Sequence, residues 1–282
     1  MRWQLGRRSN NVEDRRGTGV SAPLVGGGVG AVVLSLIVFL LGGDPSVIWE
    51  QGGQQNSPTD SPQTASPVQD QMADFVSVVL ADTEDTWRDI FRQSSKTYVE
   101  PTLVLYSDAV ESACGFARSA MGPFYCPRDQ KVYIDLSFYQ DLKTQYQAPG
   151  DFAQAYVVAH EVGHHVQNLL GIADQVRTLQ SQVGRVEANQ LSVKLELQAD
   201  CFAGVWANHA QRSRQVLEEG DIEEALNAAS SIGDDRLQSQ AKGYIVPESF
   251  THGSSAQRVR WFKRGIQTGD PEQCNTFESA KL

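Results

Sequence analysis

The chain has 282 residues, of which 40% are hydrophobic and 21% are charged, and its formal net charge is −10. This composition is typical of a folded protein and excludes a chain that is disordered throughout. The negative charge argues against nucleic acid as a partner, because binding to phosphates requires a positively charged surface.

A basic N-terminus is followed by a long apolar segment. Residues 1–16 contain five arginines and two acidic residues, and no charged residue occurs from Gly17 to Gly43. The apolar segment can form a helix that spans a bilayer, with a buried helix of a soluble domain as the alternative. It lacks the small-residue cleavage site of a secretory signal, so we expect an uncleaved transmembrane helix at 22–43. Because positive residues stay on the cytoplasmic side, we expect residues 1–21 in the cytoplasm and the rest of the chain outside.

The composition changes again after the apolar segment. Residues 44–71 are rich in Gly, Gln, Ser, Pro and Thr, which predicts a flexible linker. Residues 72–282 are numerous enough to form a domain with its own core.

Four cysteines lie in this domain, and in an exported protein an even number favours disulfides. We expect Cys114 to pair with Cys126 and Cys201 with Cys274, which is one of three possible pairings. Buried free thiols are the alternative.

Within the domain the expected strands come before most of the expected helices. Alternating apolar and β-branched residues predict short strands at 103–106, 124–126 and 131–135. Helical patterns cover 71–94, 151–170, 174–212 with a break near Gly184, a segment that starts at Asp221, and 254–266. Asp151 and Asp221 are expected to cap their helices. The order predicts an α+β fold with a small sheet and a mostly helical remainder.

Residues 160–164 read His-Glu-Val-Gly-His, an HExxH motif within the helix predicted for 151–170. His160 and His164 are four residues apart and lie on the same helix face, so both imidazoles can bind one Zn²⁺. Glu161 is placed to hold a water at the open position of the metal and to take its proton. In a chain of this composition the motif arises by chance only roughly 0.005 times, so it predicts a catalytic zinc site.

A catalytic zinc site requires a third protein ligand and keeps a fourth position open. No third histidine follows at the short metzincin spacing, where Leu170 stands, and His165 points to another side of the helix. Two carboxylates, Glu196 and Asp200, lie one helical turn apart further along the chain. Such a pair usually belongs to a solvated helix face, but after an HExxH motif we interpret it as part of the metal site. We expect Glu196 to be the third ligand, with Glu187 as the alternative, and Asp200 to accept the second ring N–H of a ligand histidine.

Several blocks of the sequence resemble the bacterial neutral zinc metallopeptidase family of membrane-anchored, YpfJ-like proteins. The blocks read HEVGHHVQNLLG at 160–171 and LELQADCFAGVWA at 195–207, with further similarity at 113–139 and 251–265. Together they cover most of residues 72–282.

This resemblance implies a zincin-like fold of the Glu-zincin type. In such a fold His160, His164 and Glu196 bind zinc, and Glu161 acts as the general base. The segment THGSSAQR is also similar to a histidine and arginine element of membrane-associated HtpX-type peptidases. That similarity implies that His252 lies near the reacting atoms and that Arg258 helps to order the site.

Other roles remain open for these groups. His252 can simply cap the last helix, and Arg258 can form a structural ion pair. Four tyrosines are alternative donors to the oxyanion of peptide hydrolysis: Tyr106, Tyr125, Tyr133 and Tyr244. The strands at 122–126 and 132–135 can offer a sheet edge to an extended peptide, with ordinary core strands as the alternative.

The residues and the resemblance together predict a zinc-dependent endopeptidase that acts on proteins or peptides. We expect it to be held by residues 22–43 as a single-pass protein of the bacterial cell membrane, with its catalytic domain in the periplasm or outside the cell. A catalytically silent zinc-containing surface module and a zinc hydrolase of non-peptide substrates are the alternatives.

Overall fold

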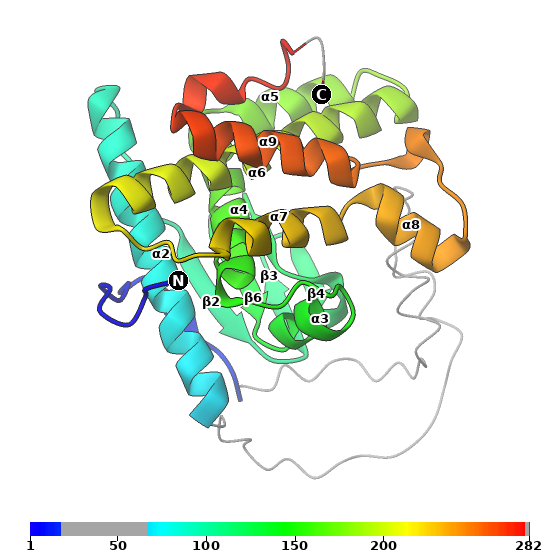
Figure 1. Cartoon of the computed structure of the whole chain (residues 1–282). Helices are drawn as coiled ribbons and strands as arrows, with labels where there is room; N and C mark the ends of the chain where they lie inside the picture. The colour runs from blue at the N-terminus through cyan, green and yellow to red at the C-terminus, as the bar shows by residue number, and fades with distance from the viewer. Residues whose placement is uncertain (18–66, 280–281) are drawn as a thin grey trace, which may run out of the picture.

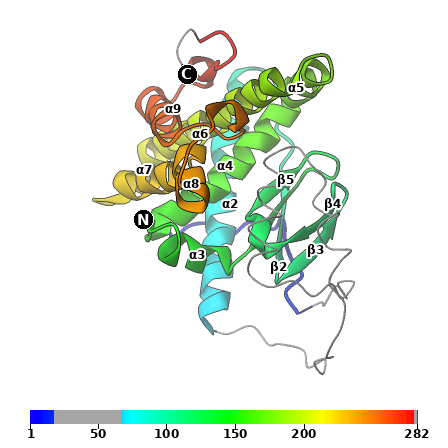
Figure 2. The same cartoon turned by 90° about the vertical axis from the view of Figure 1, so that its right-hand side faces the viewer.

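The computed structural model describes residues 1–17, 67–279 and 282. Its elements form three layers, which Figure 2 shows from the side. The strands lie in one outer layer, helices α2 and α4 lie in the middle, and α6, α7 and α9 form the other outer layer. Helix α4 is therefore covered on both sides, and its middle residues are buried.

Strands of the described residues form a mixed sheet and a separate hairpin. The bounds are β1 (Val12–Asp14), β2 (Thr102–Tyr106), β3 (Ala109–Ser112), β4 (Gly115–Arg118), β5 (Phe124–Cys126) and β6 (Lys131–Asp135). The sheet has the order β1-β2-β6-β5, in which β1, β2 and β6 are parallel and β5 is an antiparallel edge strand. The three predicted strands are confirmed as β2, β5 and β6, whereas β1 and the β3–β4 hairpin were not predicted.

Alternation along the strands gives the sheet two buried faces. Leu103, Leu105 and Ile134 point into the main core beneath the helices. Val104 and Tyr133 point to the opposite face, where the β3–β4 hairpin packs on them. The sheet is thus covered on both sides over its central strands.

Helices form most of the remaining described chain (Figure 1). Their bounds are α2 (Pro67–Gln93), α3 (Phe138–Thr144), α4 (Asp151–Leu169), α5 (Ile172–Gln180), α6 (Arg185–Arg214), α7 (Asp221–Ser231), α8 (Asp234–Lys242) and α9 (Ser255–Thr268). The five predicted helical segments are confirmed, including the break near Gly184, but α2 begins four residues earlier than predicted. Helices α3 and α8 were not predicted. The α+β class is confirmed for the described residues.

The predicted capping roles of Asp151 and Asp221 are wrong. Each is the first residue of its helix, the preceding glycine takes the cap position, and neither helix has a side-chain cap. Glu224 instead accepts a hydrogen bond from the backbone N–H of Phe152 at 3.0 Å. The carboxylate of Asp151 lies 2.6 Å from the amino group of Met1, which is buried beside it.

Two glycines let the helices around the centre of the molecule approach closely. A Cβ on Gly163 of α4 would lie 3.0 Å from the carbonyl oxygen of Ala199 on α6. A Cβ on Gly265 of α9 would lie 2.0 Å from the carbonyl oxygen of Cys201. Because neither glycine has a side chain, α4 and α9 both pack directly against the middle of α6.

Residues 1–16 pack against the rest of the described chain. Strand β1 extends the sheet, with Val12 opposite Leu103 and Asp14 opposite Leu105. The guanidinium of Arg7 lies 2.8 Å from the carboxylate of Glu84, and Arg8 lies 2.6 Å from Asp74 on the same helix. The Glu84 side chain is almost completely buried and also accepts hydrogen bonds from Ser9 and Asn11, so its partners come from the N-terminal segment.

This packing differs from the predicted separation of residues 1–21 from the domain 72–282. Four of the five arginines that suggested a cytoplasmic segment are paired with acidic residues of α2 and β1, and Arg2 lies 3.7 Å from Glu218. The predicted transmembrane helix at 22–43 and most of the linker at 44–71 lie outside the described residues. Of the helices within the described ranges, none is long and apolar enough to cross a membrane.

Both predicted disulfides are confirmed. Cys114–Cys126 ties the turn of the β3–β4 hairpin to the end of β5. Cys201–Cys274 ties the middle of α6 to the C-terminal tail. All four cysteines are paired, so the free-thiol alternative is wrong.

Candidate metal centre

Helices α4 and α6 bring the three predicted zinc ligands together. Nε2 of His160 lies 3.2 Å from one carboxylate oxygen of Glu196, and Nε2 of His164 lies 3.4 Å from the other. One donor atom from each residue lies within 4.8 Å of the other two. Glu187, the alternative ligand, lies more than two turns earlier on α6, where it is exposed.

The second ring nitrogen of His160 is held by a buried charge network. Nδ1 lies 2.9 Å from Oδ1 of Asp200, as predicted. Arg258 donates to both oxygens of this carboxylate at 2.9 Å, from Nε and Nη2. Tyr156 donates its hydroxyl proton to Oδ1 at 2.5 Å and was not predicted. Its place four residues before His160, on the same helix face, was the signal that could have identified it.

The second ring nitrogen of His164 has a neutral partner. Nδ1 lies 2.9 Å from Oε1 of Gln167, one turn later on α4. Both histidines are thus anchored at Nδ1, and both direct Nε2 towards Glu196. An outer partner at one nitrogen fixes the orientation of the ring and leaves the other nitrogen free for a metal.

The charges around the cluster favour a cation. Burial alone would lower the pKa of His160, but the negative charges of Asp200 and Glu196 raise it to about 10. Burial would raise the pKa of Glu196, but the positive charges of His164 and His252 hold it well below its ordinary value. Two imidazoles and one carboxylate are a donor set that suits zinc. The residues present therefore fit a zinc ion.

Glu161 lies beside this cluster on α4 and is buried. Burial raises the pKa of its carboxyl group above the ordinary value, although the nearby His164 and His160 act in the opposite direction. A carboxylate whose pKa is moved towards neutrality suits a general base.

His252 is held at the side of the cluster by α8. The carboxylate of Asp234 accepts hydrogen bonds from the backbone N–H groups of Thr251, His252 and Gly253 at 2.7–3.0 Å. The other oxygen of Asp234 lies 3.3 Å from Nδ1 of His252. The imidazole is about one-third exposed, and its positive charge contributes to the low pKa of Glu196. Asp234 was not predicted, because α8 itself was not.

His165 is not part of the cluster. It is completely buried, and its Nε2–H donates to the carbonyl oxygen of Val99 at 2.6 Å. Nδ1 must then accept, and the hydroxyl of Tyr125 donates to it at 3.0 Å. The expectation that His165 is not a ligand is supported, and this contact joins edge strand β5 to the HExxH helix.

The alternative tyrosines are poorly placed to donate to a reacting group. Tyr125 uses its hydroxyl on His165, and Tyr133 uses its hydroxyl on Asp129. Tyr106 is buried on the sheet face away from α4. Tyr244 lies exposed beyond α8.

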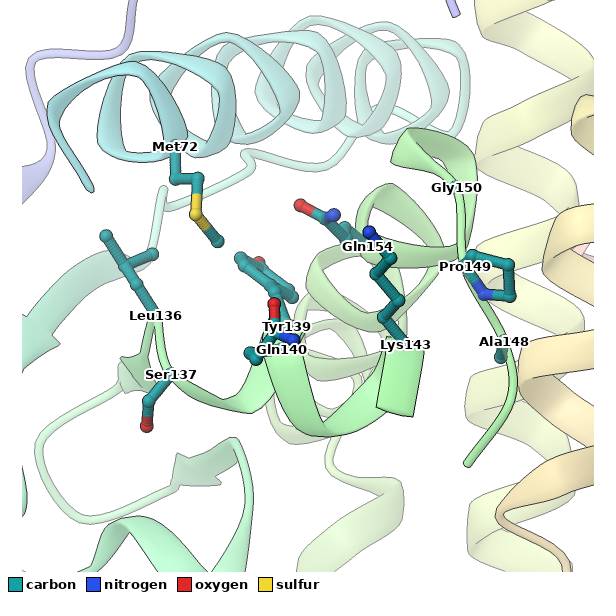
Figure 3. Close-up of a pocket in the computed structure, with 10 residues that line it drawn as sticks. All are labelled: Met72, Leu136, Ser137, Tyr139, Gln140, Lys143, Ala148, Pro149, Gly150 and Gln154. Carbon is teal, nitrogen blue, oxygen red and sulfur yellow. The ribbon is translucent and has the colours of Figure 1, made fainter. Parts of the chain in front are cut away.

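A cavity of about 350 Å³ lies apart from the cluster, between α2, α3 and the start of α4 (Figure 3). Met72 of α2 points towards Tyr139 of α3, and Gln154, six residues before His160, also lines the cavity. No His, Cys, Asp or Glu lines it, so it is not a metal site.

The chain is similar to a family of zinc metallopeptidases and to individual bacterial proteins. The family described as "Putative neutral zinc metallopeptidase" matches residues 1–277. "Uncharacterized protein YpfJ" of Escherichia coli is 54% identical over 98% of this chain and 99% of its own length. An uncharacterized protein of Mycobacterium tuberculosis is 48% identical over 66% of this chain and 65% of its own length. No solved structure matches the chain.

Proposed function

Because the chain belongs to the zinc metallopeptidase family that matches residues 1–277, whose cofactor is Zn²⁺, we propose that it is a zincin-like endopeptidase. The observation that carries the proposal is the convergence of His160, His164 and Glu196 next to the buried carboxylate of Glu161. A site that only stabilised the fold would be closed by four ligands and would need no base. Here three protein donors converge, and a base lies beside them.

We propose that His160, His164 and Glu196 hold the metal. Zinc, when bound, lowers the pKa of a water molecule and polarises the carbonyl group of the substrate. Glu161 takes the proton of the attacking water and delivers it to the leaving amine as the peptide bond breaks. His252 donates a hydrogen bond to the oxygen that becomes negative in the transition state, with Asp234 fixing its orientation.

The sheet edge beside α4 supports an extended peptide substrate. Strand β5 is an edge strand of the sheet, and Tyr125 joins it to the HExxH helix. A substrate can add to this edge through main-chain hydrogen bonds, which position it without a sequence requirement. Strand β6 is an inner strand between β2 and β5, so the part of the prediction that used residues 132–135 as an edge is wrong.

Removal and return of zinc test this proposal. The full chain, purified from an oxidising compartment, is expected to contain about one zinc per chain and to hydrolyse unfolded casein. A chelator is expected to abolish hydrolysis, and added zinc is expected to restore it. Hydrolysis that survives complete zinc removal would contradict the mechanism.

Replacement of His252 by Ala is expected to lower kcat by about 10²–10³, because one donor to the oxyanion is lost. Zinc content and KM are expected to change little, since His252 is outside the ligand set. Steady-state kinetics with a defined peptide and metal analysis check both expectations. His209→Ala on the far part of α6 is the matched control. An unchanged kcat in H252A would leave His252 with only a structural role.

We also propose that the domain works in an oxidising compartment of a bacterial cell, attached to the cell membrane through residues 22–43. Support comes from the two disulfides, which persist outside the reducing cytoplasm, and from the length of the apolar segment. The catalytic domain is placed in the periplasm or outside the cell by this proposal.

A further inference from the structure

We propose that Gln167 and Gln198 position the second zinc ligand, His164, by linking it through buried amide groups to the C-terminal tail. The inference rests on the proposed zinc site and adds positioning residues to it. Three hydrogen bonds form the link, and both amide side chains are buried.

The orientation of the Gln167 amide is set by its donors. Its Nε2 donates to the backbone carbonyl of Leu195 at 2.7 Å and to Oε1 of Gln198 at 3.1 Å. Since a carbonyl oxygen can only accept, the nitrogen of Gln167 must face Leu195. Oε1 of Gln167 must then face His164 and accept from its Nδ1–H.

The Gln198 amide is oriented in the same way. Its Nε2 donates to the backbone carbonyl of Cys274 at 3.1 Å, which leaves Oε1 to accept from Gln167. Two backbone carbonyls, of Leu195 and Cys274, therefore fix the direction of every hydrogen bond in the link.

The tail that supplies the last carbonyl is itself fixed to α6. Cys274 forms the disulfide with Cys201, one residue after Asp200. The hydroxyl of Thr276 donates to the carbonyl oxygen of Lys194 at 2.6 Å, and Thr276 is completely buried. The tail is thus attached to α6 on both sides of the link.

This link determines which nitrogen of the His164 ring carries the proton. An acceptor at Nδ1 keeps the proton there and leaves the lone pair of Nε2 for the metal. His160 has a charged acceptor in Asp200, whereas the acceptor of His164 is neutral and depends on a network that ends at the tail. The two ligand histidines are therefore positioned by separate systems.

Zinc affinity and a ring N–H signal test the inference. Zinc binding is measured by competition with a chromophoric chelator for the wild type and for Gln167→Leu and Gln198→Leu. We expect Gln167→Leu to weaken zinc binding about 10–100-fold and Gln198→Leu to weaken it less. Gln238→Leu is the matched control, because Gln238 is a buried amide whose partners are Ser249 and the N–H of Val246, and its zinc affinity is expected to be unchanged.

A spectroscopic measurement separates positioning from general destabilisation. In ¹H–¹⁵N spectra of the zinc-loaded protein, Nδ1–H of His164 is expected to exchange slowly with water in the wild type and rapidly in Gln167→Leu. The Nδ1–H of His160, held by Asp200, is the internal reference and is expected to stay protected in both proteins.

The disulfides provide a second pair of variants. Cys201→Ala with Cys274→Ala is expected to weaken zinc binding, whereas Cys114→Ala with Cys126→Ala is expected to leave it unchanged. Equal zinc affinity and equal protection of His164 in wild type and Gln167→Leu would overturn the inference while leaving the zinc site intact. A wild-type chain without zinc affinity would overturn the proposed function and this inference with it.

Discussion

Replacement of Glu161 by Gln is expected to lower the rate of peptide hydrolysis by on the order of 10²–10⁴, with zinc still bound. The amide keeps the size of the side chain but cannot take a proton from the attacking water. Because Glu161 is not a ligand in the proposed site, the metal content is expected to stay near that of the wild type. Metal analysis and casein hydrolysis on the same sample test both parts.

The pH dependence gives an independent check on this assignment. A general base works only when it is deprotonated, so the activity is expected to fall as the pH falls through the pKa of Glu161. Burial raises that pKa above the ordinary value of a glutamate, and the acidic limb is expected at correspondingly higher pH. A Glu161→Gln variant that kept wild-type activity would remove Glu161 from the mechanism.

Replacement of Arg258 by Ala is expected to lower the free energy of unfolding by about 3–5 kcal/mol. Arg258 and Asp200 are both buried, and Arg258 donates to both oxygens of the carboxylate. Without Arg258, the negative charge of Asp200 stays in the interior with only Tyr156 and His160 beside it. Urea unfolding of the zinc-free protein measures the loss without a contribution from metal binding.

Two variants make this prediction specific. Lys263→Ala removes an exposed cation from the same helix and is expected to change stability by at most about 0.5 kcal/mol. Adding Asp200→Asn to Arg258→Ala is expected to recover part of the loss, because the uncompensated charge disappears. A loss below about 1 kcal/mol in Arg258→Ala would mean that the carboxylate does not depend on the guanidinium.

Local patterns predicted the HExxH helix, the downstream carboxylates and the two disulfides. The spacing of His160 and His164 determines their shared helix face before any tertiary contact forms, so this part of the site was accessible from the sequence. Asp200 was accessible because it lies one turn after Glu196 on the same helix.

The features that were not predicted from the sequence depend on contacts between segments that are distant along the chain. Gln167 looks like any polar residue on the helix until the carbonyls of Leu195 and Cys274 orient it. Asp234 lies in a polar helix with no clear apolar face, and its role depends on a loop almost twenty residues later. Strand β1 is mostly polar, and its partner β2 follows about ninety residues further along the chain.

The position of β1 also restricts how this chain can relate to a bilayer. Residues 1–16 and 67–279 belong to one folded body, because β1 pairs with β2 and Arg7 pairs with Glu84. A single crossing at 22–43 requires β1 to leave β2 and Arg7 to leave Glu84, which would expose a strand edge and leave a buried carboxylate without its cation. The single-pass attachment proposed above is therefore a state in which β1 is not paired with β2 and Arg7 is not paired with Glu84.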